Sequence, residues 1–389
     1  MKSKISKQVF ILGMVSLFTD IASEMLYPIT PIFLTTVLGS SMALVGVIEG
    51  IAEATAGLLK GYFGNLSDKV GKRSIFVLIG YGISALSKPL PGIFQNIPIV
   101  LISRVSDRVG KGIRTAPRDA LLASYSDGNS GAVFGFHRAM DTLGAAIGPI
   151  IALILLSFFP DNFQLIFLVA FVPSVIAVFF TLLVKDKQTS VKVKSRKSYL
   201  EFWKSAPKQY KKILFLIVTF SLVNSSDVFL ILKSKDVSNS GTLAILGYVF
   251  YNLIYAASSY PLGGLSDKLG KQKVFSFGLI IFSAVYFGFA FIENINLIWI
   301  LFAFYGIYAA ATEGVSKAWI SDIIPNEQRG SAIGLLTMLT SFAIMIGSFL
   351  TGVLWDKFGS QFPFLLSATI SLIIGAMLIV ETYRKELRS

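Results

Sequence analysis

The chain has 389 residues, of which 54% are hydrophobic and only 15% are charged, and its mean hydropathy is +0.70. Soluble domains carry about 25% charged residues, so this composition excludes an ordinary soluble protein and indicates a membrane protein. The net charge of +13 gathers mainly in alternate connections between apolar stretches, as the orientation of membrane helices by cytoplasmic lysine and arginine requires. We therefore expect a lipid bilayer, and no nucleic acid, as the partner of this charge.

Twelve apolar stretches can be counted, and each supplies the roughly 20 residues that a membrane-spanning helix needs. Their centres lie near residues 20, 53, 84, 108, 144, 174, 222, 253, 282, 308, 341 and 371. The first stretch follows a lysine-rich start, but Asp20 and Glu24 interrupt it and it is too long for a cleaved signal peptide. We expect an all-α, multi-pass protein of the cell (plasma or inner) membrane, with both termini in the cytoplasm.

A ten-residue segment occurs twice, at 64–73 and, 199 positions later, at 263–272. Other glycines keep the same offset, such as Gly148 and Gly347. A single register over several stretches predicts a parallel repeat of whole halves. We predict a six-helix bundle at 1–184, a basic cytoplasmic linker at 185–210 and a second six-helix bundle at 211–389.

The predicted linker mixes aromatic and basic residues. Tyr199, Leu200, Phe202 and Trp203 lie among several lysines. This mixture suits a short amphipathic helix on an anionic membrane surface, and a flexible tether between the halves fits the sequence equally well.

The two loops resemble the Gly-x-x-x-Asp-x-x-Gly-Arg/Lys-Arg/Lys signature of the major facilitator superfamily, with Asp68 and Asp267 at the acidic position. The resemblance covers the whole chain and implies twelve transmembrane helices in two six-helix halves that work by alternating access. It also implies a gating role for the loop residues, with Asp68 bonding across the halves when the inner side is closed. The candidate gating residues are Gly64, Asp68, Gly71, Arg73, Asp267 and Gly270.

Two further segments bear on this resemblance. Gly144, Gly148 and Pro149 match part of the family's antiporter signature, while Ala152 and Leu153 replace its final glycines. The partial match favours proton-coupled export. A third, weaker echo of the loop signature at 352–359 falls on the predicted outer side, and we interpret it as chance or decay.

The fourth apolar stretch carries charges at helical spacings of three and four: Arg104, Asp107, Arg108, Lys111, Arg114 and Arg118. A charge at the bilayer centre costs at least about 2.5 to 3.5 kcal/mol, so this stripe must face counter-charges or a wet cavity. Internal ion pairs and an anion-binding surface are both open interpretations. On the second interpretation Arg104, Arg108 and Lys111 contact the substrate.

Acidic residues on neighbouring stretches are the natural partners of the stripe. A proton-coupling carboxylate must alternate between a charged, paired state and a neutral, desolvated one, and the candidates are Asp20, Glu24 and Asp141. Glu49 and Glu53 fit better as neutralising partners of the fourth stretch. For His137, the single histidine, we expect a hydrogen-bonded structural role.

The second half lacks this charge. At the 199-residue offset Ala303, Ile307 and Ala310 replace Arg104, Arg108 and Lys111, and aromatic and polar residues are enriched instead. Packing explains tyrosines at such spacing more often than ligand contact does, although buried hydroxyls need partners. The candidate substrate contacts in this half are Tyr251, Asn252, Tyr255, Tyr305 and Tyr308.

These patterns predict a secondary active transporter that works by alternating access. We expect a monomer that couples protons to the export of a small organic, amphiphilic or anionic solute, with the site between a charged wall and an aromatic wall. Proton-coupled uptake, facilitated diffusion and a sensor without transport stay open. The sequence has no Gly-x-x-x-x-Gly-Lys-Ser/Thr loop for direct ATP use, and we expect no enzyme, cofactor or metal-ligand cluster.

Overall fold

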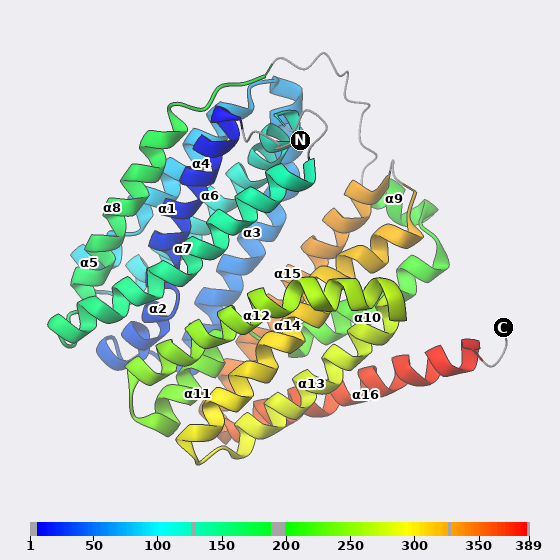
Figure 1. Ribbon diagram of the computed structural model, residues 1–389. Coiled ribbons are helices and arrows are strands. Elements are labelled where there is room, and N and C mark those ends of the chain that lie inside the picture. Colours follow the sequence, from blue (N-terminus) through cyan, green and yellow to red (C-terminus); the bar gives the residue numbers. More distant parts are fainter. Residues whose placement is uncertain (1–5, 126–129, 188–198, 326–327, 387–389) are drawn as a thin grey trace. The chain divides into compact units, whose positions relative to one another are not determined.

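A computed structural model describes residues 6–125, 130–187, 199–325 and 328–386 (Figure 1). The described residues form helices joined by short connections. They fall into two compact units, one made of Met1–Ser40 with Ile51–Arg196 and the other of Ser41–Gly50 with Lys197–Ser389. Each unit is described below by itself.

The first unit contains α1 to α8, apart from the start of α3. Its elements are α1 (Lys7–Leu26), α2 (Ile29–Ile32), the π-helical turn η1 (Phe33–Val37), α3 (Met42–Val70), α4 (Arg73–Ser87), α5 (Leu90–Ile93), α6 (Ile97–Ser124), α7 (Ser130–Phe158) and α8 (Phe163–Thr181). The start of α3, up to Gly50, belongs to the second unit.

The second unit contains the remaining helices. They are α9 (Tyr199–Ser205), α10 (Lys208–Val223), α11 (Val228–Ser238), α12 (Gly241–Leu269), α13 (Lys271–Phe291), α14 (Ile295–Ile323), α15 (Arg329–Phe358) and α16 (Gln361–Glu386). Across the described residues, 11 segments are long and apolar enough to cross a membrane. The predicted fourth span is α6, whose 28 residues extend about 42 Å but whose charges lower its hydropathy.

Prolines and polar caps set where the helices begin and end. Asn96 caps α6 by accepting a bond from the N–H of Ile99 at 3.0 Å, which satisfies a donor that the first turn leaves free. Proline cannot continue a helical hydrogen-bond ladder, and the chain breaks at Pro28 and Pro89. The second break follows Lys88 directly and fixes this lysine at the end of α4.

Glycines let neighbouring helices approach backbone to backbone. A Cβ on Gly148 of α7 would lie 2.5 Å from the carbonyl oxygen of Ile21 in α1, and a Cβ on Gly347 of α15 would lie 2.4 Å from that of Leu222 in α10. The two glycines are 199 positions apart. The offset found in the sequence therefore corresponds to the same kind of helix contact in each unit.

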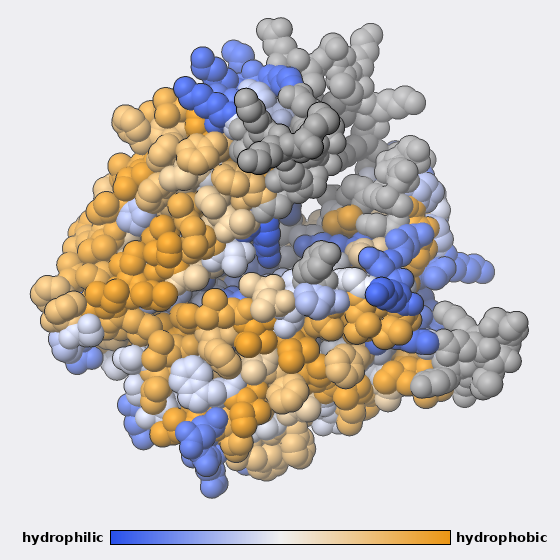
Figure 2. All heavy atoms as spheres, viewed as in Figure 1, coloured by the Kyte–Doolittle hydropathy of each residue, from blue (hydrophilic) through white to orange (hydrophobic). Residues whose placement is uncertain are grey.

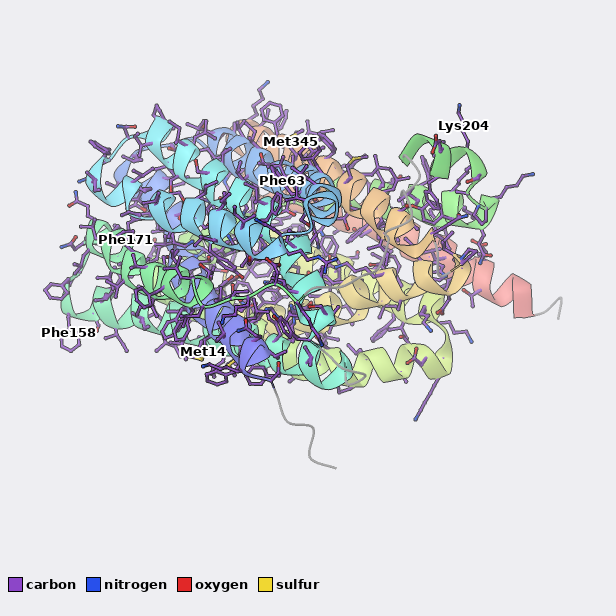
Figure 3. The ribbon with its side chains drawn as sticks, turned by 90° about the horizontal axis from the view of Figure 1, so that it is seen from above. Met14, Phe63, Phe158, Phe171, Lys204 and Met345 are labelled. Carbon is purple, nitrogen blue, oxygen red and sulfur yellow. The ribbon has the colours of Figure 1, made fainter. Side chains whose placement is uncertain are left out.

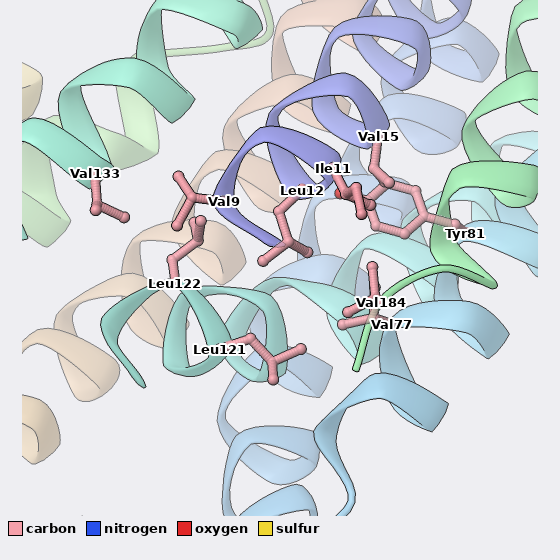
Figure 4. Close-up of a cluster of buried hydrophobic side chains, with 10 residues drawn as sticks. All are labelled: Val9, Ile11, Leu12, Val15, Val77, Tyr81, Leu121, Leu122, Val133 and Val184. Atoms are coloured by element: carbon pink, nitrogen blue, oxygen red, sulfur yellow. The ribbon is translucent and has the colours of Figure 1, made fainter. Parts of the chain in front are cut away.

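Apolar side chains fill the core and also cover the outside of the helices. In the first unit a buried cluster joins the start of α1 to α4, α6 and α7 (Figure 4); its members are Val9, Ile11, Leu12, Val15, Val77, Tyr81, Leu121, Leu122, Val133 and Val184. Large apolar side chains such as Phe158, which is 75% exposed, point outward (Figures 2 and 3). Such exposure is expected of surfaces that contact lipid.

The predicted linker contains the short helix α9, within the second unit. Phe202 is buried and packs edge to face on Tyr210, with ring centroids 5.3 Å apart. The Lys211 ammonium lies 5.2 Å from the centroid of the Trp203 ring. The aromatic residues of this segment therefore fix α9 to the second unit, while residues 188–198 lie outside the described chain.

Candidate substrate and proton sites

Helices α4 and α6 of the first unit make a close contact that carries a buried ion pair. A Cβ on Gly110 would lie 2.4 Å from the carbonyl oxygen of Gly80, so only glycine permits this approach. Nearby, Lys88 Nζ lies 2.8 Å from Asp107 Oδ1, with only 3% and 14% of these side chains exposed. The lysine and the aspartate thus neutralise each other inside the unit.

Arg114 reinforces the same contact. It donates a short hydrogen bond to Ser84 Oγ, and its guanidinium lies 4.3 Å from the centroid of the Tyr81 ring, a cation–π geometry. Ser84 Oγ in turn donates to the Asp107 carbonyl at 3.1 Å. This part of the predicted charged stripe therefore holds α4 against α6.

Arg104 lies towards the beginning of α6 and lines a small polar cavity. The cavity has room for about one water molecule. Its polar lining residues are Ser23, Thr30, Lys88, Ser103, Arg104 and Asp107. The Arg104 guanidinium, on a side chain that is 8% exposed, lies 5.7 Å from the centroid of the Tyr27 ring.

Arg108 and Lys111 complete the stripe and differ from Arg104 in exposure. Lys111 is exposed in the first unit and Arg108 is partly buried. Glu53 and Asp20 attract the Lys111 ammonium, while Arg108 repels it. The Nε atom of Arg108 is buried and has no hydrogen-bond partner among the described residues. The positive charge at this point of α6 therefore lies near Glu53 and Asp20.

The three candidate proton carriers lie on α1 and α7, which pack closely. Asp20 lies near the acidic residues Asp141 and Glu24 and near the basic residues Lys111 and Arg118. The close approach depends on Gly144, where a Cβ would lie 2.9 Å from Asp20 Cβ. The neighbouring acids disfavour the ionised form of Asp20 and the nearby cations favour it. Gain or loss of a proton by Asp20 therefore depends on where the cations lie.

Each carboxylate oxygen of Asp141 also contacts a neighbouring side chain. Ser16 donates a short hydrogen bond to Asp141 Oδ1, and His137 Nδ1 lies 3.5 Å from Oδ2. His137 is 4% exposed, and its Nε2 has no hydrogen-bond partner in the part of the chain that the structure describes. The histidine therefore contacts the acidic cluster, and its expected structural role stays a prediction.

The predicted aromatic residues of the second unit form one packed cluster. The ring centroids of Tyr251 and Tyr305 are 4.9 Å apart, those of Tyr305 and Tyr308 are 5.2 Å apart, and those of Phe282 and Tyr308 are 4.8 Å apart. All three tyrosines are at most 5% exposed. Packing is thus their common role, and only their polar ends can contact a ligand.

The polar ends of these residues contact two acids and one backbone group. Tyr305 Oη donates to Asp227 Oδ1 at 2.6 Å, and Tyr255 Oη donates to Glu313 Oε2 at 2.8 Å. The Asn252 side-chain amide donates to the Tyr248 carbonyl in its own helix at 3.0 Å. Asn252 therefore keeps its side-chain oxygen and its second amide N–H for a ligand.

Two site residues, Lys88 and Tyr286, were not identified from the sequence, whereas Asp227 belongs to the polar residues enriched in the second half. Lys88 stands inside an apolar stretch beside a proline that interrupts a helix. An ionisable residue at such a break indicates function when it lies inside a membrane, so this signal would have identified Lys88. Tyr286 carries no comparable signal.

The two repeated loops have the same local geometry. Ser67 Oγ donates to the Gly64 carbonyl at 2.9 Å, and Ser266 Oγ donates to the Gly263 carbonyl at 2.7 Å. Both loops then end on glycines with positive φ, +72° at Gly71 and +96° at Gly270. Glycine adopts this conformation without steric cost, so it explains the paired glycines. The Asp68 side chain lies outside the described atoms.

The acids around the loops bond within their own units. Asp186 Oδ1 accepts bonds from the N–H groups of Arg73 and Ser74, at 2.9 and 3.1 Å, and so caps the start of α4. In the second unit Lys271 Nζ lies 3.0 Å from Asp267 Oδ1 and 2.8 Å from Asp322 Oδ2. Asp186 is therefore a capping residue of the first loop that the sequence did not reveal.

The third echo makes specific contacts, which chance or decay of a signature does not predict. Asp356 accepts a bond from the Met42 N–H at 3.0 Å and from the Ala43 N–H at 2.8 Å, which caps the start of α3 within the second unit. Gly359 has φ +78°, as its counterparts Gly71 and Gly270 have positive φ. A Cβ on Gly352 would lie 2.2 Å from the Met42 carbonyl oxygen.

Comparison with known proteins identifies the family. The Major Facilitator Superfamily model matches residues 12–234 and 213–389. An uncharacterized MFS-type transporter of Methanocaldococcus jannaschii is 34% identical, with 97% of this chain and 95% of that protein covered. The proton-coupled antiporter flippase LtaA of Staphylococcus saprophyticus is 23% identical over 79% of this chain and 77% of that protein.

Solved structures agree with this assignment. The crystal structure of the nucleoside transporter NupG superposes with a TM-score of 0.79 at 14% identity, covering 96% of this chain and 99% of that one. The predicted all-helical membrane fold is thereby confirmed. The chain belongs to the major facilitator superfamily of multi-pass membrane transporters, which are not enzymes.

Proposed function

We propose that this secondary transporter exports a small organic solute, amphiphilic or anionic, in exchange for protons. The observation that carries the proposal is the position of Asp20, which lies near two acids and near Lys111 and Arg118 of the charged helix α6. Proton loss from such a carboxyl group depends on where those cations lie. A solute that binds the cations and a proton that binds the acid are therefore coupled through the same charges.

The exchange follows from this coupling. With Asp20 ionised, the carboxylate holds Lys111 and Arg118 in the arrangement that binds the solute. A proton on Asp20 removes this counter-charge, so the two cations move and the solute is released. Proton and solute therefore occupy the protein in turn, as exchange requires. Glu24 and Asp141 share the negative charge with Asp20 and are the second and third candidates for the proton site.

Two sets of residues are proposed to recognise the solute. In the first unit Arg104, Arg108 and Lys111 supply positive charge to an anionic group. In the second unit the polar ends of the packed tyrosines and of Asn252 supply hydrogen bonds, and the less buried ring of Tyr255 supplies apolar area. A solute with an anionic end and an apolar body satisfies both sets.

The relative LtaA, a proton-coupled antiporter flippase, supports protons as the coupling ion and exchange as the mode of transport. The match extends over most of both chains. The partial antiporter signature at Gly144, Gly148 and Pro149 agrees with it, because these glycines hold α7 against the proton candidates of α1.

The test is transport by the purified protein in proteoliposomes with an imposed pH gradient. Organic anions and amphiphilic drugs are screened, and flux of each is compared with and without the gradient. We expect the gradient to drive flux in the native protein and not in Asp20→Asn, with gradient-independent exchange of solute retained. Glu201→Gln, on α9, is the matched control. Gradient-insensitive flux in the native protein would favour facilitated diffusion.

We further propose a gating role for the first loop and a cytoplasmic position for both termini in the cell membrane. Asp68→Asn should lower the transport rate and leave insertion intact. Because the chain has no cysteine, single cysteines near either terminus can be labelled by an impermeant maleimide in cells. Labelling before lysis would contradict the cytoplasmic assignment.

A further inference from the structure

The membrane segment Lys208–Ser238 of the second unit is broken in its middle. Helix α10 ends at Val223 and α11 begins at Val228, which leaves Asn224, Ser225, Ser226 and Asp227 outside both helices (Figure 1). Broken helices inside a membrane are tolerated where they line a site, because the freed polar groups need partners.

Neighbouring helices hold this break in place. Ser348 Oγ of α15 accepts a bond from the Ser226 N–H at 3.0 Å, and Ser367 Oγ of α16 donates to the Val223 carbonyl at 2.7 Å. The break is thus a defined part of the packed unit rather than a frayed helix end.

Three side-chain oxygens lie buried at the break. They are Asn224 Oδ1, Ser225 Oγ and Tyr286 Oη. Ser225 and Tyr286 are 3% and 1% exposed and interact with each other, whereas Asn224 Oδ1 has no partner among the described residues. A buried polar group without a partner costs about 1 to 3 kcal/mol, so the amide oxygen beside two hydroxyl groups indicates a bound species that they serve.

A carboxylate completes the group of oxygens. Asp227 lies two residues after Ser225 in the chain and acts electrostatically on Tyr286, whose hydroxyl also interacts with the hydroxyls of Ser225 and Tyr305. Tyr305 Oη donates to one Asp227 oxygen at 2.6 Å, which orients the carboxylate. The C-terminal end of α10 adds the negative end of a helix dipole to the same place.

The chemistry of this donor set selects its ligand. All of the proposed ligand atoms are oxygens, one group is anionic, and a monovalent cation would be neutralised by one carboxylate. Hard cations prefer oxygen ligands, whereas the imidazole and thiolate ligands favoured by zinc are absent from these residues. In membrane transporters unwound backbone and helix C-terminal ends bind sodium ions.

We propose that the break between α10 and α11 is a binding site for an alkali-metal cation, with Asn224, Ser225, Asp227 and Tyr286 as oxygen ligands. The site goes beyond proton-coupled export, since it supplies a second ion to the transport cycle. It lies wholly in the second unit, so it does not depend on Asp20.

The experiment measures cation binding to the purified full-length protein in detergent. Melting temperature and binding of radioactive sodium are followed as NaCl, LiCl or KCl replaces N-methyl-D-glucamine chloride at constant ionic strength. We expect one of the three alkali ions to raise the melting temperature saturably, and the two methods to give the same affinity for sodium if sodium is that ion.

Three variants locate the site. Tyr286→Phe and Ser225→Ala each remove one oxygen and should weaken cation affinity about tenfold, and Asp227→Asn should abolish binding. Tyr81→Phe is the matched control, because it also removes a buried tyrosine hydroxyl but lies in the first unit; it should leave affinity unchanged.

Two results would overturn the proposal. Identical melting in all four chlorides would mean that the oxygens bind no alkali cation. Equal cation response in the native protein, Tyr286→Phe and Ser225→Ala would place the ion elsewhere. Neither result bears on gradient-driven export, which the Asp20→Asn transport assay tests separately.

Discussion

The contact of α4 with α6 and the contact of α13 with α14 both bring two helices close together, but different side chains surround them. In the first unit Gly80 and Gly110 let two backbones meet, and in the second unit a Cβ on Gly278 would lie 2.6 Å from the side chain of Thr312 and 3.0 Å from that of Ala311. Both contacts therefore depend on small residues at the crossing.

The side chains around the two crossings differ in charge. At the 199-residue offset Phe287 replaces Lys88 and Gly306 replaces Asp107. Aromatic rings replace the charges in the second unit, where the centroids of Phe282 in α13 and Tyr308 in α14 are 4.8 Å apart. The second unit packs this contact without an ion pair, so the fold does not require the pair. Because burying two charges costs desolvation free energy, we infer that the first unit retains them for function.

Breaking the ion pair should give the largest effect on stability. Lys88→Met leaves the Asp107 carboxylate buried without its cation, which costs about 3 to 5 kcal/mol in the free energy of unfolding. We expect a strong fall in the melting temperature of the purified protein. Phe287→Ala at the equivalent position of the second unit, 57% exposed, should change the melting temperature little.

A double variant separates charge from packing. Lys88→Met with Asp107→Leu removes both charges, so most of the lost stability should return, as replacement of a buried pair by apolar residues is often neutral. If the double variant melts as low as the single one, packing rather than charge holds this contact, and the contrast between the units disappears.

Substitution at a crossing glycine should give the next largest effect. Gly110→Ala places a methyl group 2.4 Å from a backbone oxygen, and such overpacking costs about 1 to 3 kcal/mol. The control is Gly314→Ala in α14, where a Cβ would meet no atom of the described residues within 4 Å. That variant should gain roughly 0.5 to 1 kcal/mol because alanine favours helix over glycine. Equal melting of the two variants would contradict the close approach of the backbones at this crossing.

The sequence sufficed for the fold because its signals were local and periodic. Apolar length identified the helices, and the 199-residue register paired Gly148 with Gly347, which do contact equivalent helices. The family and the all-helical membrane fold followed from the loop signature and are confirmed. The division of the chain into two six-helix bundles joined by a linker at residues 185–210 remains a prediction.

The site was less accessible to sequence reasoning because its partners are distant in the chain. The spacing of Asp107 and Arg114 showed that they share a face of α6, but nothing in the sequence joined Asp107 to Lys88 or Asp356 to the start of α3. These contacts depend on helix packing. The signature around Asp356 was visible in the sequence, but the two backbone N–H groups that this carboxylate caps were not.

Two tyrosine variants test how burial changes the contribution of a hydroxyl group to the stability of the second unit. Tyr305→Phe removes a donor to Asp227 in a buried cluster and should cost about 1 to 3 kcal/mol. Tyr255→Phe removes a more exposed bond to Glu313, for which about 0.5 kcal/mol is expected. Thermal melting without added alkali salt measures both. A larger loss for Tyr255→Phe would show that the buried cluster does not depend on its acid.

The smallest expected effect concerns the third copy of the loop signature. Asp356→Asn keeps the shape of the side chain and removes its charge, so the cap on the N–H groups of Met42 and Ala43 weakens by about 1 kcal/mol. Amide exchange at these two residues, followed by mass spectrometry, should accelerate roughly fivefold. Since α3 continues from the second unit into the first, a looser cap should also change the transport rate.

The control for this variant is Asp267→Asn, at the equivalent acidic position of the second loop. Its carboxylate is 71% exposed, and its partner Lys271 keeps the bond to Asp322. Exchange at the start of α3 should therefore stay as in the native protein. If both variants accelerate exchange equally, the cap is not specific to Asp356; if neither does, the signature at 352–359 has no role in holding α3, and its earlier interpretation as decay would stand.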